Sequence, residues 1–141
     1  MKLKHVKLFL RLALSLSFLS AVADRFGLWA KEISVWGNWD NFLSYTQIIN
    51  PWFPESIIPV IGAAATILEI LLALFLIIGF KTEFFAKLSG FLLLIFALSM
   101  TFSTGIKGAF DYSVFTASAA AFALSTIKQK WLEIDLFIQK K

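Results

Sequence analysis

The chain has 141 residues, of which 59% are hydrophobic and only 16% are charged; it contains one histidine and no cysteine. Soluble domains carry about a quarter charged residues, so this composition excludes an ordinary soluble domain, and its high hydrophobicity excludes a disordered chain. The absence of thiols excludes disulfide exchange, thiolate nucleophiles, cysteine-held zinc and iron–sulfur clusters, and we expect no metal site. Length and composition together predict one integral membrane domain over residues 1–141.

Four long apolar runs predict an all-α fold, an integral membrane four-helix bundle. The expected helices cover about residues 6–26, 57–80, 84–106 and 112–128. The last run is the shortest, and it reaches a spanning length only if the lysines that follow it extend to the membrane surface. The first run also fits a cleavable signal peptide that ends at Ala21-Val22-Ala23, although Arg11 interrupts the apolar stretch that such signals normally keep free of charge.

The lysines and arginines predict the orientation of the bundle. Ten of the thirteen fall on one side of a four-helix topology, and only Arg25, Lys31 and Lys107 fall on the other. Because basic residues favour the cytoplasmic side, we expect both the N- and the C-terminus in the cytoplasm. Membrane topology and lipid headgroups then explain the net charge of +4, and no nucleic-acid partner is expected. The outer loop, residues 27–56, carries four tryptophans, which indicates that it rests on the membrane surface.

Glu69 is the first candidate functional residue, since it lies near the centre of the second apolar run. An ionisable residue inside a membrane indicates a functional site that faces the bundle interior. Arg11 is its expected partner, because both residues lie on the same cytoplasmic half of the bundle and each is the ionisable group within the apolar part of its helix. The pair fits two interpretations, a buried ion pair that fixes helix register or a site that handles a ligand or a proton.

A second polar group is expected at the outer helix ends. It consists of Asp24, Arg25, Lys107, Asp111 and Tyr112. These side chains fit either a polar lid over the bundle or a set of solvated helix ends.

Several short segments, in their order and spacing, resemble the DoxX family of small bacterial four-helix membrane proteins over nearly the whole chain. They are LRLAL (residues 10–14), ADRFG (23–27), LEILL (68–72), LIIGFKT (76–82), DYS (111–113) and EID (133–135). The glycine-rich stretch that is common in the family before the last segment is missing. The resemblance implies four helices, a bacterial inner-membrane location and an association with redox enzymes; a related branch forms the membrane subunit of a thiosulfate:quinone oxidoreductase. By position, Arg11, Arg25, Glu69 and Asp111 are the counterparts of the family's polar residues.

The expected function is that of an accessory protein or membrane subunit of a redox-linked system, with a quinone or another lipid held in the bundle. The expected partners are membrane lipid, a redox enzyme subunit and further copies of this chain. The alternatives are a structural or lipid-binding membrane protein and a small transporter, both without a redox role. An autonomous oxidoreductase is not expected, because the chain has no thiol, metal cluster or nucleotide-binding glycine motif.

Overall fold

The computed structural model describes residues 2–138, and its regular structure is entirely helical. The elements are α1 (Leu3–Arg25), α2 (Trp39–Ile49), the 3-10 helix η1 (Glu55–Ile57), α3 (Ile58–Ile78), α4 (Thr82–Ser103), α5 (Ile106–Asp111), α6 (Val114–Thr126) and α7 (Asp135–Ile138). Helix α1, helix α4 and the continuous segment of η1 and α3 are long and apolar enough to cross a membrane, whereas α6 is apolar but shorter. The prediction of an all-helical protein is thereby confirmed, with three helices long and apolar enough to span a membrane.

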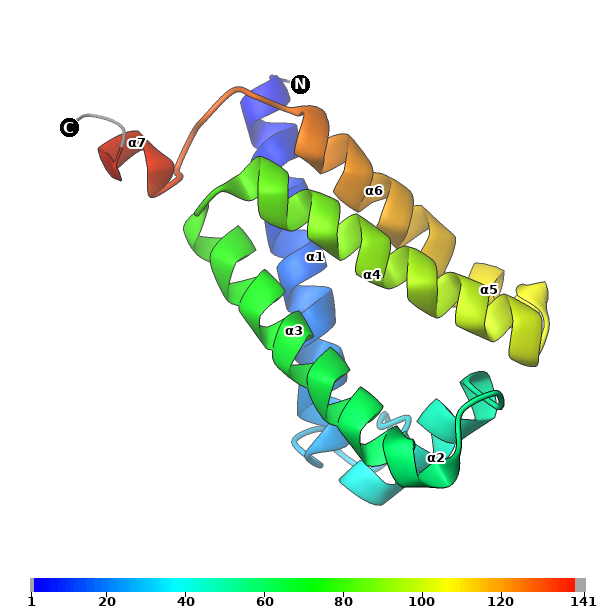
Figure 1. Ribbon diagram of the computed structural model, residues 1–141. Helices are drawn as coiled ribbons and strands as arrows, with labels where there is room; N and C mark the ends of the chain where they lie inside the picture. Colours follow the sequence, from blue (N-terminus) through cyan, green and yellow to red (C-terminus); the bar gives the residue numbers. More distant parts are fainter. Residues whose placement is uncertain (1, 139–141) are drawn as a thin grey trace.

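The long helices form two pairs that meet at one end and diverge at the other (Figure 1). Helix α1 packs along α3, and α4 packs along α6. At the closed end, where α1 begins and α6 ends, Leu14 and Leu76 of the first pair contact Ala86 and Leu124 of the second. At the other end α3 and α4 separate, and α2 lies between them (Figure 1). This arrangement places α2 across the open side of the bundle.

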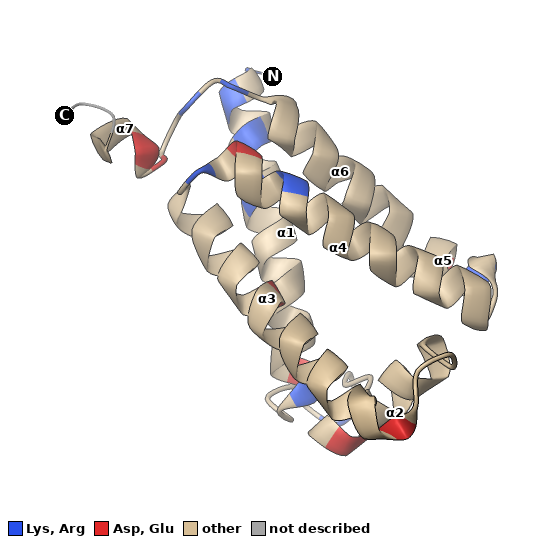
Figure 2. Ribbon diagram, in the orientation of Figure 1, with Lys and Arg blue, Asp and Glu red and all other residues tan. Residues whose placement is uncertain are grey.

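The outward faces of the long helices are apolar. Exposed side chains on α3 and α4 include Ile67, Leu71, Leu74, Phe91, Ile95 and Phe102. Charged residues gather instead at the helix ends, and Glu69 is the acidic residue within α3 (Figure 2). A surface of this kind suits contact with lipid hydrocarbon rather than with water.

The segment of residues 27–56, expected as a loop, contains a helix. The side chain of Asn38 accepts a hydrogen bond of 2.8 Å from the backbone N–H of Asn41 and thereby caps the start of α2. Phe42, Thr46 and Ile49 are the buried residues of α2 and share one face of it. The prediction of a plain connection is therefore wrong for residues 39–49, where this face packs against the bundle.

The fourth expected helix, residues 112–128, is shorter than predicted. Its start is displaced because Ser113 adopts a left-handed backbone (φ 56°), which separates α5 from α6. The third expected helix, residues 84–106, ends early for a related reason: Gly105 has φ 101° and cannot continue α4. Helix α6 consequently has 13 residues.

The segment of residues 127–135, here called the C-terminal strap, folds back over the closed end of the bundle. Its Glu133 carboxylate lies 2.7 Å from Lys7 Nζ of α1 and accepts a hydrogen bond of 3.0 Å from the Thr82 hydroxyl of α4. The backbone N–H of Ile134 donates to the carbonyl of Ile78 at 2.9 Å. These contacts, made by an acidic side chain and by the backbone, tie the strap to α1, α3 and α4.

Gly79 allows the strap to pack closely against the end of α3. Gly79→Ala is expected to lower the free energy of unfolding by about 2–4 kcal/mol, because alanine is strained in a left-handed backbone and its added Cβ would overpack this contact. Gly79 ends α3 with φ 71°, and an added Cβ would lie 2.6 Å from Cα of Glu133 and 2.7 Å from Nη2 of Arg11. Gly108→Ala is the matched control, because there the nearest neighbour, Cε of Met100, lies at 3.4 Å. Denaturant titration in detergent micelles measures both, and equal losses would contradict the role given to Gly79.

Candidate ligand-binding cavity

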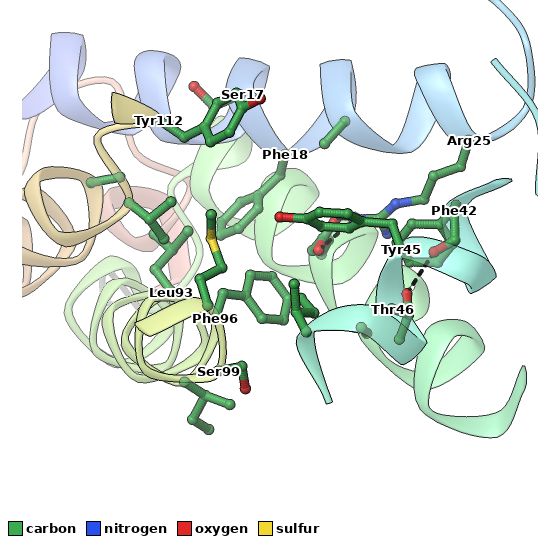
Figure 3. Close-up of a pocket in the computed structure, with 18 of the residues that line it drawn as sticks. Ser17, Phe18, Arg25, Phe42, Tyr45, Thr46, Leu93, Phe96, Ser99 and Tyr112 are labelled. Carbon is green, nitrogen blue, oxygen red and sulfur yellow. Dashed lines mark hydrogen bonds and ion pairs between the residues drawn. The ribbon is translucent and has the colours of Figure 1, made fainter. Parts of the chain in front are cut away.

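A cavity of about 390 Å³ lies between the two helix pairs (Figure 3). Helix α2 closes one side of it with Phe42, Tyr45 and Ile49. The remaining lining comes from α1, α3, α4 and α6, from residues on either side of α2, and from Tyr112 between α5 and α6, and most of these side chains are apolar or aromatic. Ligand pockets of proteins are mostly apolar with a few polar groups, and volumes of about 300–1,000 Å³ are usual for them.

The two charged residues that line the cavity form an ion pair with each other. Nη2 of Arg25 lies 2.8 Å from both carboxylate oxygens of Glu69, and the two side chains are 4% and 1% exposed. Nη1 of Arg25 donates a hydrogen bond of 2.6 Å to the hydroxyl of Thr66. The ring of Phe42 lies on the guanidinium, with its centroid 4.1 Å from Cζ. The pair is therefore neutral as a unit and shielded by aromatic side chains.

The predicted contact between Arg11 and Glu69 is wrong. Arg11 donates instead to four backbone carbonyls, those of Leu76, Ile77, Trp131 and Leu132, at 2.8–3.2 Å. The carbonyls of Leu76 and Ile77 belong to the last turn of α3, where the regular i+4 helical donors are missing, although Leu76 also accepts a bond of 3.3 Å from the N–H of Gly79. The charge of Arg11 thus caps α3 and holds the C-terminal strap, and its nearest carboxylate oxygen belongs to Glu133, at 3.9 Å.

The expected outer polar group does not form one cluster. The carboxylate of Asp24 accepts hydrogen bonds from the Ser34 hydroxyl and from the N–H groups of Val35 and Trp36, and so fixes the chain after α1. Arg25 turns into the bundle toward Glu69.

Lys107 and Asp111 pair with each other on the exposed face of α5, with side chains 84% and 57% exposed. They are solvated charges at a helix end rather than part of a polar lid, and they do not cover the cavity. Tyr112 does reach the cavity and is part of its lining.

Several residues of the cavity were not predicted from the sequence, among them Trp36, Phe42, Tyr45 and Thr46. Trp36, Phe42 and Tyr45 lie in the segment that was expected as a loop. Burial raises the pKa of the Tyr45 hydroxyl above its ordinary value, and Tyr112 nearby raises it further, so this phenol keeps its proton at neutral pH. The helical spacing of Phe42, Thr46 and Ile49 was the signal that could have placed this segment in the bundle.

Within residues 2–138, no three histidine, aspartate or glutamate side chains come together as a metal site requires. Comparison of the chain with models of known protein families, with curated proteins and with solved structures finds no match.

Proposed function

We propose that this chain is a DoxX-like protein of the bacterial inner membrane, that α6 forms a fourth span, and that both termini face the cytoplasm. Three helices of sufficient length support the membrane assignment. The orientation is supported by the lysines and arginines, most of which lie at the closed end of the bundle (Figure 2). They include Lys2, Lys4, Lys7, Lys81, Lys87, Lys128 and Lys130. Basic residues at one end favour the cytoplasmic placement of that end.

The proposed activity is the binding of a lipid-like ligand, such as a quinone, by an accessory protein or membrane subunit of a redox-linked system. The observation that carries this proposal is the cavity between the helix pairs, whose lining is largely apolar. The helices around its mouth have apolar outward faces that suit contact with lipid, so an amphiphile dissolved in the bilayer has direct access to the cavity. The resemblance to the DoxX family is the argument for a redox enzyme as partner. A structural or lipid-binding protein without a redox role is the second candidate. It is favoured by the buried Arg25–Glu69 ion pair, because these two charges bind each other rather than a ligand.

Filling the cavity tests the proposed binding. Ala65 lines the cavity, whereas Ala64 next to it on α3 is exposed on the outer face. We expect Ala65→Phe to reduce the ligand that co-purifies with the protein by about tenfold, and Ala64→Phe to leave it unchanged, since only the first ring occupies the site. Mass spectrometry of the lipids and polypeptides bound to the native protein provides the measurement.

The identity of the bound molecules separates the candidates. A quinone or a redox enzyme that is retained by the wild type and lost in Ala65→Phe supports the redox-linked function. Bulk phospholipid in equal amounts in all three proteins contradicts it and favours the second candidate.

A further inference from the structure

Both tyrosines of the chain line the same cavity, although they come from different parts of the sequence. Tyr45 belongs to α2, and Tyr112 lies directly between α5 and α6. In Figure 3 Tyr45 extends from α2 into the middle of the lining residues, while Tyr112 lies at their edge. Tyr112 is 69% exposed, so its ring stands where the cavity opens.

Neither phenol hydroxyl forms a hydrogen bond within the described residues 2–138, unlike the other hydroxyls at the cavity. Thr46 donates to the carbonyl of Phe42 at 2.8 Å, and Ser99 donates to the side chain of Asn50 at 3.2 Å. A phenol hydroxyl in a mostly apolar environment gains from an acceptor, because few other hydrogen-bond partners are within its reach. Tyr45 and Tyr112 are thus the cavity hydroxyls with a free proton to donate.

The charged groups of the cavity carry no net charge, although the buried Nε of Arg25 and Nε1 of Trp36 also lack a hydrogen-bond partner within residues 2–138. Arg25 and Glu69 neutralise each other, and Phe42 and Trp36 flank the guanidinium at 4.1 and 5.5 Å. An anionic head would meet no uncompensated positive charge here and would lie close to the carboxylate of Glu69. Burying a charge without a counter-charge is strongly unfavourable, so the site selects against anions.

We propose that Tyr45 and Tyr112 bind the head of an uncharged amphiphile whose oxygens accept hydrogen bonds, while its apolar tail fills the space between the helix pairs. This inference rests on the proposed function, and it adds the residues that hold the head and the charge that the head must lack. Carbonyl oxygens on a ring, as in a quinone, fit this description; a fatty acid carboxylate does not.

The test uses the full chain in phosphatidylcholine nanodiscs with two probes, a benzoquinone that carries a decyl tail and tetradecanoate. Binding of the benzoquinone is measured by the quenching of tryptophan fluorescence. Binding of tetradecanoate is measured by its displacement of the benzoquinone, which restores the fluorescence. We expect Tyr45→Phe and Tyr112→Phe each to weaken benzoquinone binding by about three- to tenfold, the effect of one hydrogen bond, and the double variant to weaken it further. Phenylalanine keeps the ring, so the packing of the cavity is preserved.

Ser44→Ala is the control, because Ser44 is exposed on α2 and its hydroxyl donates to the carbonyl of Asp40. Tetradecanoate is expected to bind at least about tenfold more weakly than the benzoquinone, as expected for a buried anion without a free counter-charge. Binding of the benzoquinone that is unchanged in the double variant, or tetradecanoate that binds as tightly, overturns this inference but leaves the proposed function standing. Absence of benzoquinone binding to the wild type overturns both.

Discussion

Arg25→Met is expected to lower the free energy of unfolding by about 3–5 kcal/mol, the usual effect of breaking a buried ion pair. The substitution leaves the carboxylate of Glu69, which is 1% exposed, without its partner, and it also removes the donor to Thr66. The double variant Arg25→Met, Glu69→Leu is expected to lose less than Arg25→Met alone, because neither charge is then stranded. Unfolding by dodecyl sulfate in mixed micelles measures Arg25→Met, Glu69→Leu, the double variant and the wild type.

The exposed ion pair of α5 provides the matched control for this comparison of single and double variants. Lys107 and Asp111 have the same charges at an i,i+4 spacing, but their side chains are mostly in contact with solvent or headgroups. Such pairs contribute about 0.5 kcal/mol, so Lys107→Met should have little effect. If the losses in Arg25→Met and Glu69→Leu sum to the loss in the double variant within about 0.5 kcal/mol, the two residues do not act as a pair.

Arg11→Met is expected to release the C-terminal strap from the bundle. Arg11 is 1% exposed and satisfies four carbonyls, and each buried polar group left without a partner costs about 1–3 kcal/mol. The readout is amide hydrogen exchange at Ile134, whose N–H bonds to the carbonyl of Ile78. We expect its protection to fall by about a hundredfold or more, which corresponds to about 3 kcal/mol.

Two further variants keep this prediction testable if Arg11→Met does not fold. Glu133→Gln keeps an acceptor for the Thr82 hydroxyl but deprives Lys7 of its counter-charge, so it should weaken protection at Ile134 partially. Lys128→Met changes an exposed residue of the same strap and should leave protection unchanged. Protection at Ile134 that is equal in Glu133→Gln and Lys128→Met would contradict the role assigned to these charges.

The sequence was sufficient to predict the long helices, since uninterrupted apolar runs of spanning length leave few alternatives. Their ends were less predictable, because they depend on backbone geometry at single residues such as Ser113 and Gly105. Helix α2 was missed for a different reason. Its segment has the cap and the apolar spacing of a short helix, but its tryptophans and prolines directed the interpretation toward a surface loop.

Depth along a helix was too weak a criterion for predicting partners. Glu69 lies near the middle of α3, so a long side chain from either end of α1 can reach its level, and Arg25 is the one that faces it. The actual partners of Arg11 include carbonyls of Trp131 and Leu132, and these depend on the chain folding back after α6. A long-range contact of this kind leaves no periodic signal in the sequence.

The shortness of α6 has a consequence for the surrounding bilayer. Its 13 residues rise about 20 Å at about 1.5 Å per residue, against a hydrocarbon thickness of about 30 Å. On the proposed four-span topology this hydrophobic mismatch draws the two leaflets together beside α6, and lipids with shorter acyl chains relieve it best. Tyr112 lies just before the first residue of α6, so on this topology the mouth of the cavity opens where the membrane is thinnest. An amphiphile there has the shortest way to travel from the headgroup layer.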